Sequence, residues 1–213
     1  MASTVPRPRR PRGSAPRTSP GTAAETSERA RWYETELGWA VAEGPPVQLL
    51  TGVRFDVLEL PAGAGAALLR RTPRTGPVAL TGTRMRLLVA AGSAEELPEL
   101  LEWLEWGGIA LDLTAIGAGG RMTAPPPPGR AGSREAAVWL RPPVPGREVE
   151  PSLPAAAPFG HGPETGRGTC PDLVRLLATA ATECHRARLL DMNARAYACT
   201  NAYEYTACEY SAD

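Results

Sequence analysis

The pattern of apolar and polar residues divides the chain into a central part with regular periodicity and two ends without it. The densest apolar stretch, residues 53–60, is rich in β-branched and aliphatic side chains and is followed by Pro61, which predicts a largely buried strand that ends there. Shorter apolar runs predict further strands over residues 39–41, 47–50, 78–80, 84–90, 109–113 and 136–140.

Apolar residues at helical spacing predict four helices. The first begins at Thr26 or Ser27 and ends at Gly38, because glycine accepts the left-handed conformation at a helix C-terminus. Ser93 and Glu96 form a capping-box signature at the start of the third helix. The predicted helices span residues 26–37, 62–71, 93–106 and 170–190.

This order of helices and strands predicts an α+β domain, with a mainly antiparallel sheet and flanking helices. We expect the domain to span residues 26–143, followed by a Pro/Gly-rich linker over 144–169 and a C-terminal helix over 170–190. Residues 1–25 and 191–213 lack apolar periodicity, so both are expected to be disordered tails.

Composition and charge narrow the classes of function. The chain of 213 residues has a formal net charge of zero, which argues against a broadly basic nucleic-acid surface. It has no apolar run of the roughly 18 residues needed to span a bilayer and no apolar signal-peptide core, so we expect a cytoplasmic protein without membrane association. The four cysteines have no metal-site spacing and are expected to be free thiols.

Two carboxylates on the predicted central strand raise the question of a metal site. Side chains on a strand alternate between its faces, so Asp56 and Glu59 point to opposite sides and cannot share a metal ion. A strand that binds catalytic magnesium usually presents acids at positions i and i+2. Here the i+2 partner of Glu59 is Pro61, which has no ligand atom in its side chain.

Seven short motifs follow one another between residues 29 and 143. They are Ala30-Arg-Trp-Tyr, Gly38-Trp39-Ala-Val, Leu50-Thr-Gly, Val57-Leu-Glu, Thr81-Gly-Thr-Arg-Met-Arg-Leu-Leu, Ala110-Leu-Asp112-Leu and Thr123-Ala-Pro-Pro. In this order the motifs resemble the N-terminal domain of bifunctional DNA primase/polymerases. The chain looks most like a short actinobacterial branch of that family in which the catalytic motifs have drifted.

The resemblance implies a fold of the archaeo-eukaryotic primase type. Active members of that family hold two magnesium ions on three acids and use a histidine near the phosphates of the incoming nucleotide. Carried over by position, the first and second acids fall on Glu59 and Pro61, the histidine falls on Met85, and the third acid falls on Asp112. Pro61 and Met85 can neither bind magnesium nor donate to a phosphate, so Mg²⁺ or Mn²⁺ is expected only if activity is retained.

Two interpretations stay open for each group of charged residues. Glu59 and Asp112 form either a residual metal site or a pair of carboxylates tied to nearby arginines. Arg84 or Arg86 either replaces the histidine as a phosphate donor, since guanidinium groups suit phosphate, or is a solvent-facing strand residue.

Three functions follow from these alternatives. The first is a non-catalytic, regulatory module that binds a nucleotide, nucleic acid or a protein partner. The second is a residual metal-dependent nucleotidyltransferase, a DNA primase/polymerase that uses Glu59, Asp112 and an arginine. The third is a structural domain whose helix over residues 170–190 docks on a partner or on a second copy as a homodimer. Loss of two of the four catalytic positions favours the first function over an enzyme.

Overall fold

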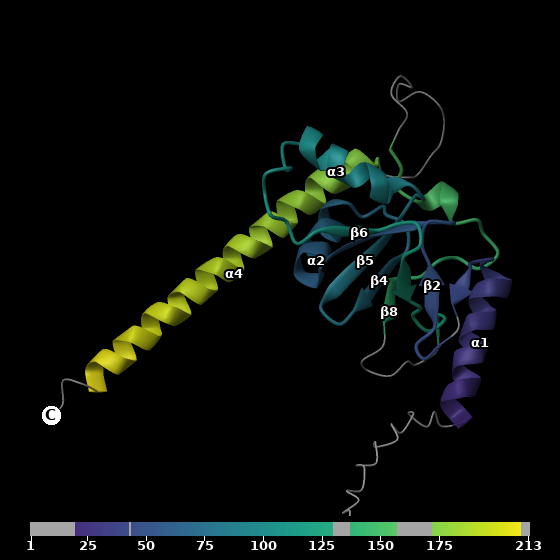
Figure 1. Ribbon diagram of the computed structural model, residues 1–213, viewed down its shortest axis with the longest axis horizontal. Coiled ribbons are helices and arrows are strands. Elements are labelled where there is room, and N and C mark those ends of the chain that lie inside the picture. The colour runs from purple at the N-terminus through teal and green to yellow at the C-terminus, as the bar shows by residue number, and fades with distance from the viewer. Residues whose placement is uncertain (1–19, 43, 130–136, 157–171, 210–213) are drawn as a thin grey trace, which may run out of the picture.

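The structure is a computed structural model that describes residues 20–42, 44–129, 137–156 and 172–209. In this part of the chain eight strands form two sheets, flanked by four α-helices and one short 3₁₀ helix (Figure 1). In chain order the elements are α1 (Pro20–Glu36), β1 (Val41–Ala42), β2 (Gln48–Leu50), β3 (Asp56–Pro61), α2 (Ala62–Arg71), β4 (Val78–Thr81), β5 (Arg84–Val89), α3 (Ser93–Trp103), β6 (Thr114–Ile116), β7 (Arg121–Thr123), β8 (Val138–Arg141), η1 (Glu150–Ser152) and α4 (Leu173–Glu209).

Both sheets are antiparallel, as the sequence predicted. The larger one has the strand order β6-β3-β5-β4-β8, and the smaller one has the order β1-β2-β7. The central strand β3 is paired on both sides, with β5 and with β6. The mixture of antiparallel sheets with flanking helices confirms the predicted α+β class.

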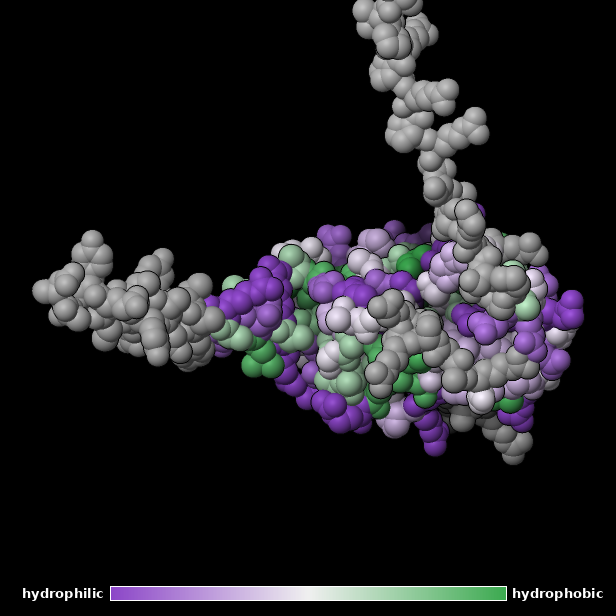
Figure 2. All heavy atoms as spheres, turned by 90° about the horizontal axis from the view of Figure 1, so that it is seen from below, coloured by the Kyte–Doolittle hydropathy of each residue, from purple (hydrophilic) through white to green (hydrophobic). Residues whose placement is uncertain are grey.

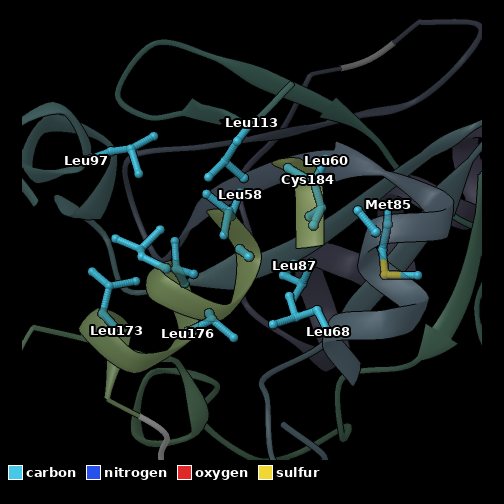
Figure 3. Close-up of a cluster of buried hydrophobic side chains, with 14 of the residues drawn as sticks. Leu58, Leu60, Leu68, Met85, Leu87, Leu97, Leu113, Leu173, Leu176 and Cys184 are labelled. Atoms are coloured by element: carbon cyan, nitrogen blue, oxygen red, sulfur yellow. The ribbon is translucent and has the colours of Figure 1, made fainter. Parts of the chain in front are cut away.

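One face of the five-stranded sheet, here called the helix face, is covered by α2, α3 and the first turns of α4 (Figure 1). Leu58 and Leu60 of β3 and Leu87 of β5 point to this face and are almost fully buried. Figure 3 shows their side chains converging with Leu68 of α2 and Leu176 of α4. The first turns of α4 are therefore part of the domain core.

The other face of the sheet, here called the opposite face, packs on α1 and on the three-stranded sheet. Its core is aromatic: Tyr33 stacks on Trp39 with ring centroids 5.8 Å apart, and Trp39 lies 4.7 Å from Phe55. The Tyr33 hydroxyl donates to the Pro125 carbonyl at 2.7 Å and accepts from the Trp139 indole N–H at 2.9 Å. Burial raises the pKa of Tyr33 well above its usual value, so the phenol remains protonated and both hydrogen bonds persist.

The helices differ from the prediction mainly at their ends. Helix α1 begins at Pro20, before Thr26, and Gly38 follows its end with a φ of 64°, as predicted. The capping box predicted at the start of α3 is wrong, because the N-cap is Gly92 and has no side-chain hydrogen bond. A carboxylate oxygen of Asp56 instead accepts the Ala94 amide at 2.9 Å, so the cap comes from the neighbouring strand.

Two segments between α3 and α4 differ in kind from the prediction. The strand predicted over residues 109–113 is irregular chain, and β6 begins directly after it at Thr114. The predicted linker is packed over its described part, residues 144–156, because Val149 and Leu153 lie in the core of the opposite face around η1. Residues 157–169 of that linker lie outside the described residues.

Helix α4 is longer than the predicted helix over residues 170–190. Asp172 caps it by accepting the Val174 amide at 2.9 Å, and the helix runs for 37 residues to Glu209. It continues through residues 191–209, where the sequence predicted no regular structure, and this part extends away from the body (Figure 1). Alanine, the strongest helix former, recurs throughout that stretch.

The projecting part of α4 exposes apolar side chains near the body. Leu189, Leu190 and Met192 are 48%, 64% and 57% exposed, and hydrophobic residues lie beside hydrophilic ones where the helix leaves the body (Figure 2). Across the described residues no helix is both long and apolar enough to cross a membrane.

Replacement of the two glycines of α2 by alanine is expected to have different effects on the free energy of unfolding. A Cβ on Gly65 would lie 2.3 Å from Sδ and 2.9 Å from Cβ of Met85, whereas a Cβ on Gly63 would meet nothing within 4 Å. Gly65→Ala should therefore lower the free energy of unfolding by about 1–3 kcal/mol through overpacking. Gly63→Ala should leave it unchanged or raise it by up to about 1 kcal/mol.

Urea unfolding of both variants measures these changes. Equal effects of the two substitutions would contradict the close approach of α2 to β5.

Candidate functional site

A cluster of four charged side chains lies where β3, β5 and the segment before β6 meet. We call Glu59, Arg84, Arg86 and Asp112 the arginine–carboxylate cluster. Glu59 is directly opposite Arg86 in the β3–β5 pair, and Arg84 lies two residues away on the same strand. Directly opposed residues of an antiparallel pair share a face, so these three side chains point away from the helix face.

Glu59 is the centre of this cluster. One of its carboxylate oxygens accepts from Nε of Arg84 at 3.1 Å, and the other accepts from Nε of Arg86 at 2.7 Å. The Glu59 and Arg86 side chains are only 17% and 16% exposed. Such partly buried ion pairs are stronger than surface pairs, because water screens them less.

Arg84 joins the two acids of the cluster. Its Nη1 lies 2.7 Å from Oδ1 of Asp112, while its Nε bonds Glu59. Burial lowers the pKa of Arg84, but the hydrogen bonds and charges of Asp112 and Glu59 together raise the pKa above its usual value. The guanidinium therefore stays charged and holds both carboxylates.

The cluster is neutral as a whole, because two arginines face two carboxylates. Among the described residues, no group of three or more His, Cys, Asp or Glu side chains is placed to hold a metal ion. Nη1 of Arg86 is buried, and within the described part of the chain it has no hydrogen-bond partner. The cluster thus contains carboxylates that are already paired and one unused guanidinium donor.

Helix α4 holds the segment that carries Asp112. The Cys184 thiol lies 3.8 Å from the Asp112 carbonyl, and the Arg188 guanidinium donates to the Ala110 carbonyl. Burial, followed by the nearby charge of Asp112, raises the pKa of Cys184 to about 12, so this cysteine remains a neutral thiol. The Asp112 side chain itself is 61% exposed.

The two acids of β3 lie on opposite faces, as their alternation predicts. Asp56 is fully buried on the helix face, where it caps α3, and its second oxygen has no hydrogen-bond partner among the described residues. Glu59 faces the arginines on the other side of the strand. Asp56 is therefore a structural residue of the fold, separate from the cluster.

The residues at the positions that the resemblance assigned to the second acid and the histidine contribute no side chain to the cluster. Pro61 is the last residue of β3, lies opposite Arg84 and offers no ligand atom to the cluster. Met85 is buried in the core of the helix face against Gly65. The side chains of β5 that do face Glu59 are Arg84 and Arg86.

Of the two interpretations left open by the sequence, the ion pairs agree with carboxylates tied to nearby arginines, although the sequence did not identify which arginines. Arg84 and Arg86 are 25% and 16% exposed, so the interpretation as solvent-facing strand residues is wrong. The signal was present in the alternation of Arg84, Met85 and Arg86, which places two guanidinium groups on one face of a strand. The sequence could not show that this face meets Glu59, because strand register is a long-range property.

Comparison with family models, with curated proteins and with solved structures finds no match to this chain. The arginine–carboxylate cluster is therefore interpreted from its own geometry.

Glu59 and Asp112 are expected to differ sharply in their contribution to stability. Glu59→Gln removes the charge that neutralises two partly buried arginines and should lower the free energy of unfolding by about 1–3 kcal/mol. Asp112→Asn removes a single pair from a mostly exposed side chain and should lower it by less than about 1 kcal/mol.

Urea unfolding of the two variants measures the difference. If Asp112→Asn proves as destabilising as Glu59→Gln, Glu59 is not the centre of the cluster.

Proposed function

We propose that this chain is a non-catalytic relative of the N-terminal domain of bifunctional DNA primase/polymerases, which acts by binding rather than by nucleotidyl transfer. The observation that carries the proposal is the pairing of both remaining acids, Glu59 and Asp112, with arginine. The loss of ligand chemistry at Pro61 and Met85 supports it from the sequence.

Metal-dependent phosphoryl transfer needs carboxylates that are free to hold two cations. A cation at Glu59 would have to displace Arg84 and Arg86 from it. Leaving two partly buried arginines without their counter-charge costs about 1–3 kcal/mol. Pro61 supplies no second carboxylate to offset that cost, so the cluster favours arginine over a metal ion.

The ligand we propose for this module is a nucleotide or the phosphate of a nucleic acid. Arg84 and Arg86 project from one face of β5, and guanidinium groups bind phosphate oxygens in a fork geometry. Nη1 of Arg86 is a donor that Glu59 does not occupy, but it is buried, so a phosphate reaches it only after a movement of the side chain. A regulatory role in the cytoplasm, where nucleotides are abundant, belongs to this proposal.

The third function, docking through the helix predicted over residues 170–190, has less exposed apolar surface available than the sequence indicated. The apolar face of the helix predicted over residues 170–190 includes Leu173, Leu176 and Leu177, which are buried in the chain's own core. A partner or second copy would have to use the exposed side chains near Leu189 and Leu190. The buried leucines therefore favour the binding role of the cluster over docking through this helix.

Primer synthesis and extension assays test the absence of catalysis. With Mg²⁺ or Mn²⁺, the purified chain should give no more product than its Glu59→Gln variant, because neither retains a free carboxylate pair. Product that forms with the parent chain and disappears with Glu59→Gln would show a residual nucleotidyltransferase and end this proposal.

Thermal unfolding with added nucleotide tests the binding role. A nucleoside triphosphate that binds only the folded state should raise the unfolding temperature of the parent chain. Arg84→Gln should reduce this shift, measured against the variant's own unfolding temperature without nucleotide. Arg175→Gln, which removes an exposed arginine of α4 outside the cluster, should keep the full shift. No shift at millimolar nucleotide would argue against nucleotide as the ligand.

A further inference from the structure

A surface pocket of about 960 Å³ lies apart from the arginine–carboxylate cluster. It is formed by residues 73–77, between α2 and β4, and by residues from Arg141, the last residue of β8, to Ser152. Strand β4 separates the two places: Thr81 at its end is opposite Arg84, whereas Val78 at its start is opposite Arg141, a residue of the pocket wall. We call this feature the proline-walled pocket.

The charge of the proline-walled pocket is positive. Its lining contains Arg74, Arg141 and Arg147 but only one acid, Glu148, which leaves a formal charge of three minus one, or +2. Within the described ranges, none of these arginines makes an ion pair with a carboxylate. The pocket therefore presents uncompensated guanidinium groups, unlike the cluster, where every positive charge is matched.

Hydrogen bonds and prolines restrict part of the pocket wall. Nη1 of Arg141 donates to the Thr75 carbonyl at 3.0 Å and also to the Thr75 hydroxyl, which fixes this guanidinium. The Ser152 hydroxyl donates to the Val149 carbonyl at 2.6 Å. Five prolines with fixed φ angles supply much of the remaining surface. They are Pro73, Pro77, Pro142, Pro143 and Pro151.

A guanidinium that is already held in place loses less entropy on binding, so Arg141 is suited to contact a compact anion. A phosphate group carries a charge between about −1.5 and −2 at neutral pH, which matches the formal charge of the pocket. The volume is within the range of about 300–1,000 Å³ typical of small-molecule sites. A single carboxylate would leave part of the positive charge unpaired.

We propose that the proline-walled pocket binds a phosphate-bearing ligand. Arg141 contacts the phosphate from the wall, and the exposed Arg74 and Arg147 close on it from the rim. The ligand is a free oligophosphate, such as the phosphate chain of a nucleotide, or the 5′-phosphate end of a nucleic acid; both present the same group. This site is independent of the function proposed for the cluster, because it uses different arginines.

Titration calorimetry of the full chain with inorganic pyrophosphate tests the site. The parent chain should bind, and the double variant Arg74→Gln/Arg147→Gln should bind at least about tenfold more weakly, because two charge-assisted contacts are lost. Both side chains are exposed, so the variant should unfold at the temperature of the parent chain. The double variant Arg70→Gln/Arg175→Gln is the control, since it removes the same charge from exposed positions on α2 and α4 and should bind like the parent chain.

Three results would overturn the proposal. The first is the absence of pyrophosphate binding by the parent chain. The second is an equal loss in both double variants, which would show a general effect of net charge. The third is a loss with Arg84→Gln but not with Arg74→Gln/Arg147→Gln, which would place the phosphate at the arginine–carboxylate cluster.

Binding of an oligonucleotide with a 5′-phosphate, compared with the same oligonucleotide without it, distinguishes a nucleic-acid end from a free oligophosphate as the ligand. Binding that requires the 5′-phosphate and is weakened by Arg74→Gln/Arg147→Gln identifies a nucleic-acid end as a ligand of the pocket. Pyrophosphate binding alone, with the same dependence on the two arginines, identifies a free oligophosphate. Oligonucleotide binding that depends on neither the 5′-phosphate nor the two arginines, together with no pyrophosphate binding, contradicts the proposed site.

Discussion

The antiparallel register between β3 and β5 is the constraint on which the rest of the structure depends. It pairs Glu59 with Arg86 on one face while Leu58, Leu60 and Leu87 fill the core on the other. A slip by one residue would send the leucines to the wrong side and turn the arginines toward α2 and α4. Apolar packing on the helix face therefore fixes the geometry of the charged cluster behind it.

The properties that follow from local periodicity could be predicted from the sequence. The alternation of β3 correctly places Asp56 and Glu59 on opposite faces, and Gly38 correctly marks the end of α1. The properties that depend on distant partners could not. The cap of α3 comes from Asp56, thirty-eight residues before Ala94, so a local capping box at Ser93 was the wrong signal. Strand β7 has only three residues, so its composition gives little indication of a strand. It is a strand because it pairs with β2.

The same limit applies to the cluster. Its residues were all identified as candidates from the sequence, and pairing with nearby arginines was one interpretation of the two acids, but the sequence did not identify which arginine contacts which acid. The family register also placed the histidine position at Met85, which the strand turns into the core of the helix face. The neighbouring residues Arg84 and Arg86 face Glu59 instead, and guanidinium groups are suited to charge pairing and phosphate binding rather than to metal-assisted transfer. The site is thus defined by which face of β5 is exposed to Glu59, a property of tertiary structure.

The packing of α4 extends the core of the helix face beyond the proline- and glycine-rich segment. Leu173, Leu176, Leu177, Ala180 and Cys184 complete the core over β3 and β5, although a proline- and glycine-rich segment separates them from β8 in the sequence. A protein truncated at that segment would leave the leucines of the sheet in contact with water and would release the loop that carries Asp112. The core of the helix face therefore includes α4 as far as Cys184, and its boundary follows the helix rather than the change in composition.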